Sequence, residues 1–213
     1  MKLRGWSAVV GLMLLAGCAN TFVSQVSVRH DLPASMAGKV FAIDRPKADD
    51  QSLARYDFEN LLATELRRQG LVQQTDPKLA DWLVQLDYQI DDGKNASYQQ
   101  PIWGTIGYSV SYQRINTGGG IAFIPRYYPE TGIIGSQTIN ETLFTREVFV
   151  DILDRKALAA GDFAKLYEGR ARNRSLNDVL DPAVPWLIRS LFLPFPGPSG
   201  VTREVRQVLP ETK

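Results

Sequence analysis

The chain has 213 residues, with 24 Lys and Arg against 23 Asp and Glu and a formal net charge of +1. This balance, without a basic cluster, excludes nucleic acid as a partner. A hydrophobic content of 44% with four tryptophans excludes a largely disordered chain, and the length suits one domain.

The first residues have the layout of an export signal and not of a globular fold. Lys2 and Arg4 precede the apolar run Ala8–Ala16. This run is too short for a transmembrane helix, which needs about 20 residues. We therefore expect residues 1–17 to be a signal peptide, and residues 18–193 to form a single domain.

The segment Leu15-Ala16-Gly17-Cys18 resembles the lipobox of bacterial lipoproteins. The resemblance implies diacylglycerol on the thiol of Cys18, followed by cleavage before that residue. Cys18 is the only cysteine, so a disulfide is excluded. Two or three acyl chains give stable membrane attachment. Ala19, in place of an aspartate, favours by resemblance the outer membrane on its periplasmic side, with the inner membrane as the alternative.

The first part of the domain predicts two strands, a helix and a third strand. Apolar and polar residues alternate in Thr21–Leu32, and Lys39–Asp44 predicts a second strand before Pro46. Leucines at helical spacing predict a helix over Ser52–Gly70, with Gly70 just beyond its last turn. The clearest alternation, in Trp82–Asp91, predicts a strand with one buried face.

The segment 93–137 has an unusual composition, because its aromatic residues lie among glycines and polar residues. Tyr108–Ile115 and Ile121–Tyr127 predict a hairpin around Gly118-Gly119-Gly120. The aromatic side chains either pack back on the domain or bind a partner, such as an envelope protein, a glycan or lipid headgroups. The candidate partner-binding residues are Trp103, Tyr108, Tyr112, Phe123, Tyr127 and Tyr128.

The last part predicts an antiparallel hairpin and a helix. Thr138–Leu153 and Phe163–Asn173 are the two strands, and Leu176–Leu193 contains the helix, with Asp181 as its N-cap. Residues 194–213 predict a flexible tail. The order of elements predicts an α+β fold, a mostly antiparallel sheet with helices packed on one face. A closed, all-antiparallel sheet with a terminal helix is the alternative.

Five short motifs in these elements form a recognisable series. They are Val28-Arg29-His30-Asp31, Val40–Ile43, Ala80–Val84, Phe149–Asp154 and Leu166–Ala171. The series resembles an uncharacterised family of bacterial lipoproteins, of the domain of unknown function 4136 type. The resemblance implies an envelope lipoprotein of α+β type. The family has no established reaction, so it supplies no catalytic residues.

The residues themselves predict neither a metal nor a cofactor. His30 is the only histidine, and a catalytic zinc takes about three protein ligands. Neighbouring strand residues point to opposite faces, so Asp31 does not orient His30. We expect a non-enzymatic structural or binding module. One alternative is a hydrolase of cell-wall or lipid substrates that uses paired carboxylates, such as Asp87 or Glu168, as acid and base. The other is a small-ligand carrier with an enclosed apolar pocket.

Overall fold

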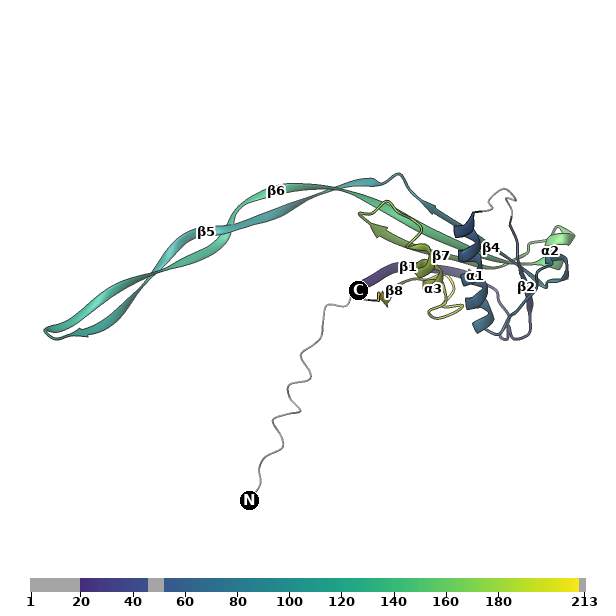
Figure 1. Ribbon diagram of the computed structural model, residues 1–213, viewed down its shortest axis with the longest axis horizontal. Helices are drawn as coiled ribbons and strands as arrows, with labels where there is room; N and C mark the ends of the chain where they lie inside the picture. The colour runs from purple at the N-terminus through teal and green to yellow at the C-terminus, as the bar shows by residue number, and fades with distance from the viewer. Residues whose placement is uncertain (1–19, 46–51, 211–213) are drawn as a thin grey trace, which may run out of the picture. The chain divides into compact units, whose positions relative to one another are not determined.

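The computed structural model describes residues 20–45 and 52–210 (Figure 1). The expected signal peptide, residues 1–17, and the expected lipidation site, Cys18, lie outside the described residues. The chain divides into two compact units, one of them being Gly93–Leu143. We call this unit the hairpin, and the described residues before Gly93 and after Leu143 the body.

Strands dominate both units. The strands are β1 (Thr21–His30), β2 (Val40–Ile43), β3 (Val72–Gln73), β4 (Trp82–Ile90), β5 (Lys94–Thr117), β6 (Gly120–Asp154), β7 (Lys165–Ser175) and β8 (Thr202–Val208). The helices are α1 (Leu53–Arg68), the 3₁₀ turn η2 (Pro77–Leu79), α2 (Arg155–Ala160) and α3 (Val184–Leu191). The sheet of the body has the order β3-β2-β4-β6-β7-β1-β8, and β5 pairs with β6.

Helix α1 follows the local signals in its sequence. The Ser52 hydroxyl accepts a hydrogen bond from the backbone N–H of Arg55 at 3.1 Å, which caps the first turn. The chain leaves the helix through Gly70, whose φ of +89° suits glycine. The predicted helix is therefore confirmed. The predicted N-cap of α3 is wrong, because α3 begins at Val184 and Ala183 precedes it without a side-chain cap.

The core of the body joins the sheet to the two longer helices. Phe41, Val84 and Ile152 from the sheet are fully buried with Leu62 of α1 and Leu187 of α3. Each such side chain stabilises the fold by about 1.5–3 kcal/mol through burial of apolar surface. Among the described residues, the buried hydrophobic side chains all belong to the body.

The expected α+β class, with a mostly antiparallel sheet and helices packed on one face, is wrong. Strands make up 55% of the described residues and helices 18%, and the sheet is mixed. Strand β2 pairs in parallel with both β3 and β4. Alternating polarity predicts that a segment is a strand, but it does not report the direction of the neighbouring strand.

The expected flexible tail is wrong for residues 202–208. They form β8, which pairs antiparallel with β1 from Thr21↔Val208 to Ser27↔Thr202. Only Val205 and Gln207 of β8 are buried, so its sequence carries a weak hydrophobic signal. Without β8, the sheet of the body would have six strands and one edge of β1 would be open. The pairing with β8 supplies hydrogen-bond partners to the backbone groups of that edge.

Candidate functional site: the β5–β6 hairpin

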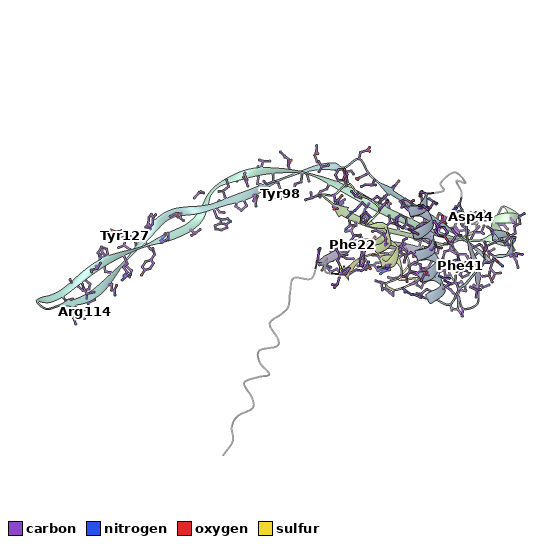
Figure 2. The ribbon with its side chains drawn as sticks, viewed as in Figure 1. Phe22, Phe41, Asp44, Tyr98, Arg114 and Tyr127 are labelled. Atoms are coloured by element: carbon purple, nitrogen blue, oxygen red, sulfur yellow. The ribbon has the colours of Figure 1, made fainter. Side chains whose placement is uncertain are left out.

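The sequence-predicted partner-binding residues all lie on β5 and β6, and all are exposed. Their exposed fractions run from 53% at Tyr128 to 66% at Tyr108 and Tyr112. The predicted hairpin is confirmed and is longer than expected, since pairing extends from Lys94↔Leu143 to Thr117↔Gly120. Figure 2 shows side chains along this ribbon, including Tyr98, Arg114 and Tyr127.

The register brings four of the six predicted residues onto one face of the ribbon. Residues directly opposite each other in an antiparallel pair lie on the same face, and every second residue along a strand returns to it. Tyr108 faces Pro129, Val110 faces Tyr127, and Tyr112 faces Pro125. We call this the aromatic face, and its residues are Tyr108, Val110, Tyr112, Phe123, Pro125, Tyr127 and Pro129.

The other two predicted residues lie elsewhere. Tyr128 lies opposite Ser109, on the reverse face of the ribbon. Trp103 lies opposite Ile133, and the register shifts on both sides of it, between Ile102 and Trp103 and between Thr105 and Gly107. Each β-bulge inserts an extra residue and changes which residues share a face. The structure thus does not group Trp103 with the aromatic face.

An isoleucine cluster in this bulged region was not predicted from the sequence. Gly104 and Gly132 are directly opposite each other. A Cβ at Gly104 would lie 2.5 Å from the Ile134 side chain, and a Cβ at Gly132 would lie 2.7 Å from that of Ile106. Each isoleucine therefore covers a glycine across the ribbon. The glycine pair is a signal for this packing, but only once the register is known.

Close to the body, polar side chains bridge the two strands of the hairpin. These hydrogen bonds are Ser97 to Asn140 at 2.6 Å, Gln99 to Thr138 at 2.8 Å, and Thr142 to Asn95 at 3.1 Å. Such cross-strand pairs stabilise a sheet by roughly 0.2–1 kcal/mol each. Between Asn95 and Gln113, β5 has no charged residue. Two further cross-strand bonds involve a charged group, Tyr98 to Glu141 at 3.3 Å and Arg126 to Gln113 at 2.6 Å.

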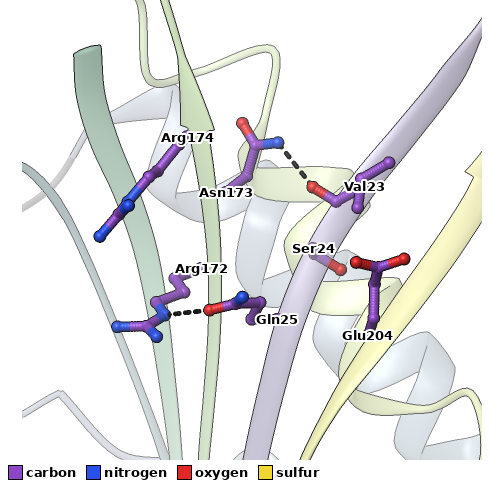
Figure 3. Close-up of a pocket in the computed structure, with 7 residues that line it drawn as sticks. All are labelled: Val23, Ser24, Gln25, Arg172, Asn173, Arg174 and Glu204. Atoms are coloured by element: carbon purple, nitrogen blue, oxygen red, sulfur yellow. Dashed lines mark hydrogen bonds between the residues drawn. The ribbon is translucent and has the colours of Figure 1, made fainter. Parts of the chain in front are cut away.

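Open hollows lie on the surface of the body among the described residues. Figure 3 shows one of about 320 Å³, lined from β1, β7 and β8. In it, Arg172 donates to the Gln25 side chain at 2.9 Å, and Asn173 donates to the Val23 carbonyl at 2.7 Å. Two of its donor side chains thus already bond to the neighbouring strand β1.

His30 contacts the loop after α3 and does not pair with Asp31. Its Nε2 lies 3.0 Å from the Gly197 carbonyl, and its ring centre is 6.5 Å from that of Tyr167. Burial raises the pKa of the Tyr167 phenol above its ordinary value, against an opposing effect of Arg203. Gly169 leaves room for the phenol, because a Cβ there would lie 2.6 Å from Tyr167 Oη.

The carboxylates named for the hydrolase alternative, Asp87 and Glu168, lie on β4 and β7, which β6 separates. Asp87 lies opposite Phe149, whereas Glu168 lies opposite Asp151. Lys165 Nζ lies 3.0 Å from Asp151 and 3.6 Å from Glu168, and its hydrogen bond to Asp151 raises the pKa of the lysine. The described residues hold no cluster of three His, Cys, Asp or Glu side chains placed for a metal ion.

No helix among residues 20–45 and 52–210 is long and apolar enough to span a bilayer. None of the curated proteins matches the chain. Among solved structures, it is similar to a PDZ domain protein from Parabacteroides distasonis, with 14% identity over 88% of this chain and 39% of that one, and a TM-score of 0.42. The chain thus spans less than half of that protein.

Two structures of the PelC dodecamer from Paraburkholderia phytofirmans are also similar. One is a point variant with 12% identity and a TM-score of 0.37, and the other has 11% identity and a TM-score of 0.36. Each match covers 78% of this chain and 91% of that chain. These low scores identify neither a function nor a partner. A family model does match most of the sequence, residues 26–197, and the chain belongs to the family described as domain of unknown function DUF4136.

Proposed function

We propose that this protein is a non-enzymatic envelope lipoprotein whose β5–β6 hairpin is its binding element. The observation that carries the proposal is the exposed aromatic face. Tyr112, Phe123 and Tyr127 are each more than 60% exposed and lie on one face of the ribbon. Exposed apolar surface gathered on one face is typical of an interaction site.

The physical chemistry of a two-stranded ribbon supports a partner. An isolated hairpin is marginally stable in water, and a third strand or a packed face is needed for independent stability. Tyrosine supplies a large contact area with a polar tip, which suits a surface that is exposed before binding and buried after it. A protein partner meets both needs, because it can cover the aromatic face and pair with a strand edge.

The anchor in this proposal is the lipid on Cys18. The Leu15-Ala16-Gly17-Cys18 segment supports it, and Ala19 supports the periplasmic side of the outer membrane. Cys18→Ala should release the protein, or leave it uncleaved, because two or three acyl chains supply the attachment. Membrane fractionation with a carbonate wash checks this. A variant that has lost its signal peptide and still stays membrane-bound after the wash argues against the lipid anchor.

The binding role is tested by two adjacent tyrosines on opposite faces. Tyr127 and Tyr128 are 65% and 53% exposed, so either can be replaced without opening the core. Tyr127→Ser should reduce recovery of crosslinked partner from intact cells, and Tyr128→Ser is the matched control. Equal recovery from both variants would show that the aromatic face is not the binding surface.

A further inference from the structure

The outer edge of β5 is open along its length. β5 is a strand of 24 residues, and in the described part of the chain it pairs with β6 alone. At about 3.3 Å per residue, this edge is roughly 80 Å long. An unpaired edge presents N–H and C=O groups that pair readily with another strand, and charged side chains are the usual protection. Asn95–Gln113 has no such charge, and its single proline, Pro101, lies seven residues before Tyr108.

Two prolines show which backbone groups point away from the ladder. Pro125 lies opposite Tyr112, and Pro129 lies opposite Tyr108. A proline has no N–H, so within a sheet it occupies a position whose nitrogen faces away from the neighbouring strand. The orientation repeats every second residue in an antiparallel pair. Tyr108, Val110 and Tyr112 therefore direct their backbone groups to the open edge of β5.

The same prolines make the two edges of the ribbon unequal. On β6, Pro125 and Pro129 remove two of the outward donors on either side of Tyr127. Opposite them, β5 keeps the donors of Tyr108, Val110 and Tyr112. The open edge available to another strand is therefore the edge of β5.

A palindromic sequence lies on this edge. The segment Tyr108-Ser109-Val110-Ser111-Tyr112 is the same in both directions. When two antiparallel copies align at Val110, Tyr108 of each copy lies opposite Tyr112 of the other, and Val110 lies opposite Val110. Aromatic cross-strand pairs stabilise such a sheet. A two-fold axis perpendicular to the sheet also places both aromatic faces on the same side.

We propose that β5 pairs with β5 of a second copy of this chain, centred on Val110. The product is a four-stranded sheet with the order β6-β5-β5-β6, and its two open edges are the proline-bearing edges of β6. This inference rests on the proposed binding role of the hairpin and names its partner.

Single cysteines in the full, membrane-attached chain test the pairing. Val110→Cys places two thiols at the two-fold axis, in a hydrogen-bonded pair with Cα atoms about 5.5 Å apart, which suits a disulfide. Tyr127→Cys is the control, because Tyr127 lies directly opposite Val110 on β6. Its two copies would be three strand spacings apart, about 14 Å. The unsubstituted chain gives the background from Cys18.

The expected result is a disulfide-linked dimer from Val110→Cys, at least tenfold more abundant than from Tyr127→Cys, on a non-reducing gel. Two outcomes overturn the proposal. One is a folded Val110→Cys chain that remains monomeric. The other is a dimer that forms only when Val110→Cys and Tyr127→Cys are co-expressed, since this requires β5 to pair with β6.

Proline substitutions supply a second readout that needs no new thiol. Val110→Pro removes an outward donor and keeps the ladder to β6, as Pro125 and Pro129 do. Ile121→Pro makes the same change on the other edge, because Ile121 lies opposite Asn116 at a position with the orientation of Pro125 and is not one of the aromatic-face residues. Val110→Pro should lower self-association in sedimentation at least tenfold, and Ile121→Pro should leave it unchanged. Equal self-association of the two variants contradicts the proposal.

The two proposals fail in different ways. If Val110→Cys remains monomeric while Tyr127→Ser still reduces the recovery of a crosslinked protein, the binding role stands and the partner is not a second copy. If Val110→Cys gives no dimer and Tyr127→Ser changes no crosslinked protein, the binding role itself is wrong.

Discussion

Removal of the hairpin should leave the body folded. The variant replaces Gly93–Leu143 by a two-residue glycine turn, which joins β4 to the remainder of β6. Those strands already meet there, because the Asp91 N–H donates to the Thr145 carbonyl at 3.1 Å and Ile90 pairs with Arg146. The described core residues all lie in the body, so the deletion removes no buried apolar contact.

The magnitude follows from loop closure. The cost of closing a flexible loop falls by about 0.6 kcal/mol per halving of its length, so replacing Gly93–Leu143 by two residues stabilises the body by at most about 3 kcal/mol. The gain is smaller than this limit because the paired strands of the hairpin already hold its ends together. For a domain of this size, the melting temperature rises by at most roughly 6–12 °C. Circular dichroism melts of both forms check this. A body that unfolds, or melts at a clearly lower temperature, would show that the hairpin aromatics belong to the core, since each lost core aromatic would cost about 3–5 kcal/mol.

Three further substitutions test the packing of the body. Tyr167→Phe should stabilise by about 1–2 kcal/mol, because the described residues offer the buried hydroxyl no hydrogen-bond partner. The raised pKa of Tyr167 means that its contribution is present below pH 10 and is lost above it. Urea titrations above that pH should therefore show a loss of stability that Tyr167→Phe lacks. His30→Ala should cost about 1 kcal/mol by removing the bond to Gly197, and complementation at unchanged protein level should be unaffected. Glu59→Ala should destabilise by about 3 kcal/mol, because it deprives Arg55 of a buried carboxylate 3.1 Å away, and a midpoint in urea close to that of the native chain would contradict this.

Local patterns in the sequence predicted the single elements well. Alternation predicted β1 and β4, and leucine spacing with Gly70 predicted α1. These signals succeed because each depends on neighbours in the chain. The glycine turn between β5 and β6 was predictable for the same reason, since a two-residue connection between strands favours glycine.

Pairing between distant strands was not predictable in this way. The parallel pairing of β2 leaves no trace in the alternation of its four residues. β8 has only two buried side chains, so its place beside β1 depends on backbone hydrogen bonds that any sequence can make. These two features explain why the expected fold class and the expected flexible tail were wrong.

The candidate site was partly predictable. The composition of the segment predicted that its aromatic residues bind a partner, but the bulges near Trp103 decide which of these residues share a face. One extra residue in a strand moves every later side chain to the opposite face. Simple alternation counted from Tyr98 therefore predicts the wrong face for Tyr108. Register information is therefore what places Tyr127, and not Tyr128, on the same face as Tyr108 and Tyr112.

The binding role of the aromatic face is tested most directly by a photo-crosslinking amino acid placed at Tyr127 in intact cells. Tyr56, on α1 of the body, is the control, because it is also a tyrosine and is 58% exposed against 65% for Tyr127. A discrete crosslinked product is expected from Tyr127, whether with a second copy or with another envelope protein, and none is expected from Tyr56. Equal labelling from both positions, or a product from Tyr56 alone, would contradict it.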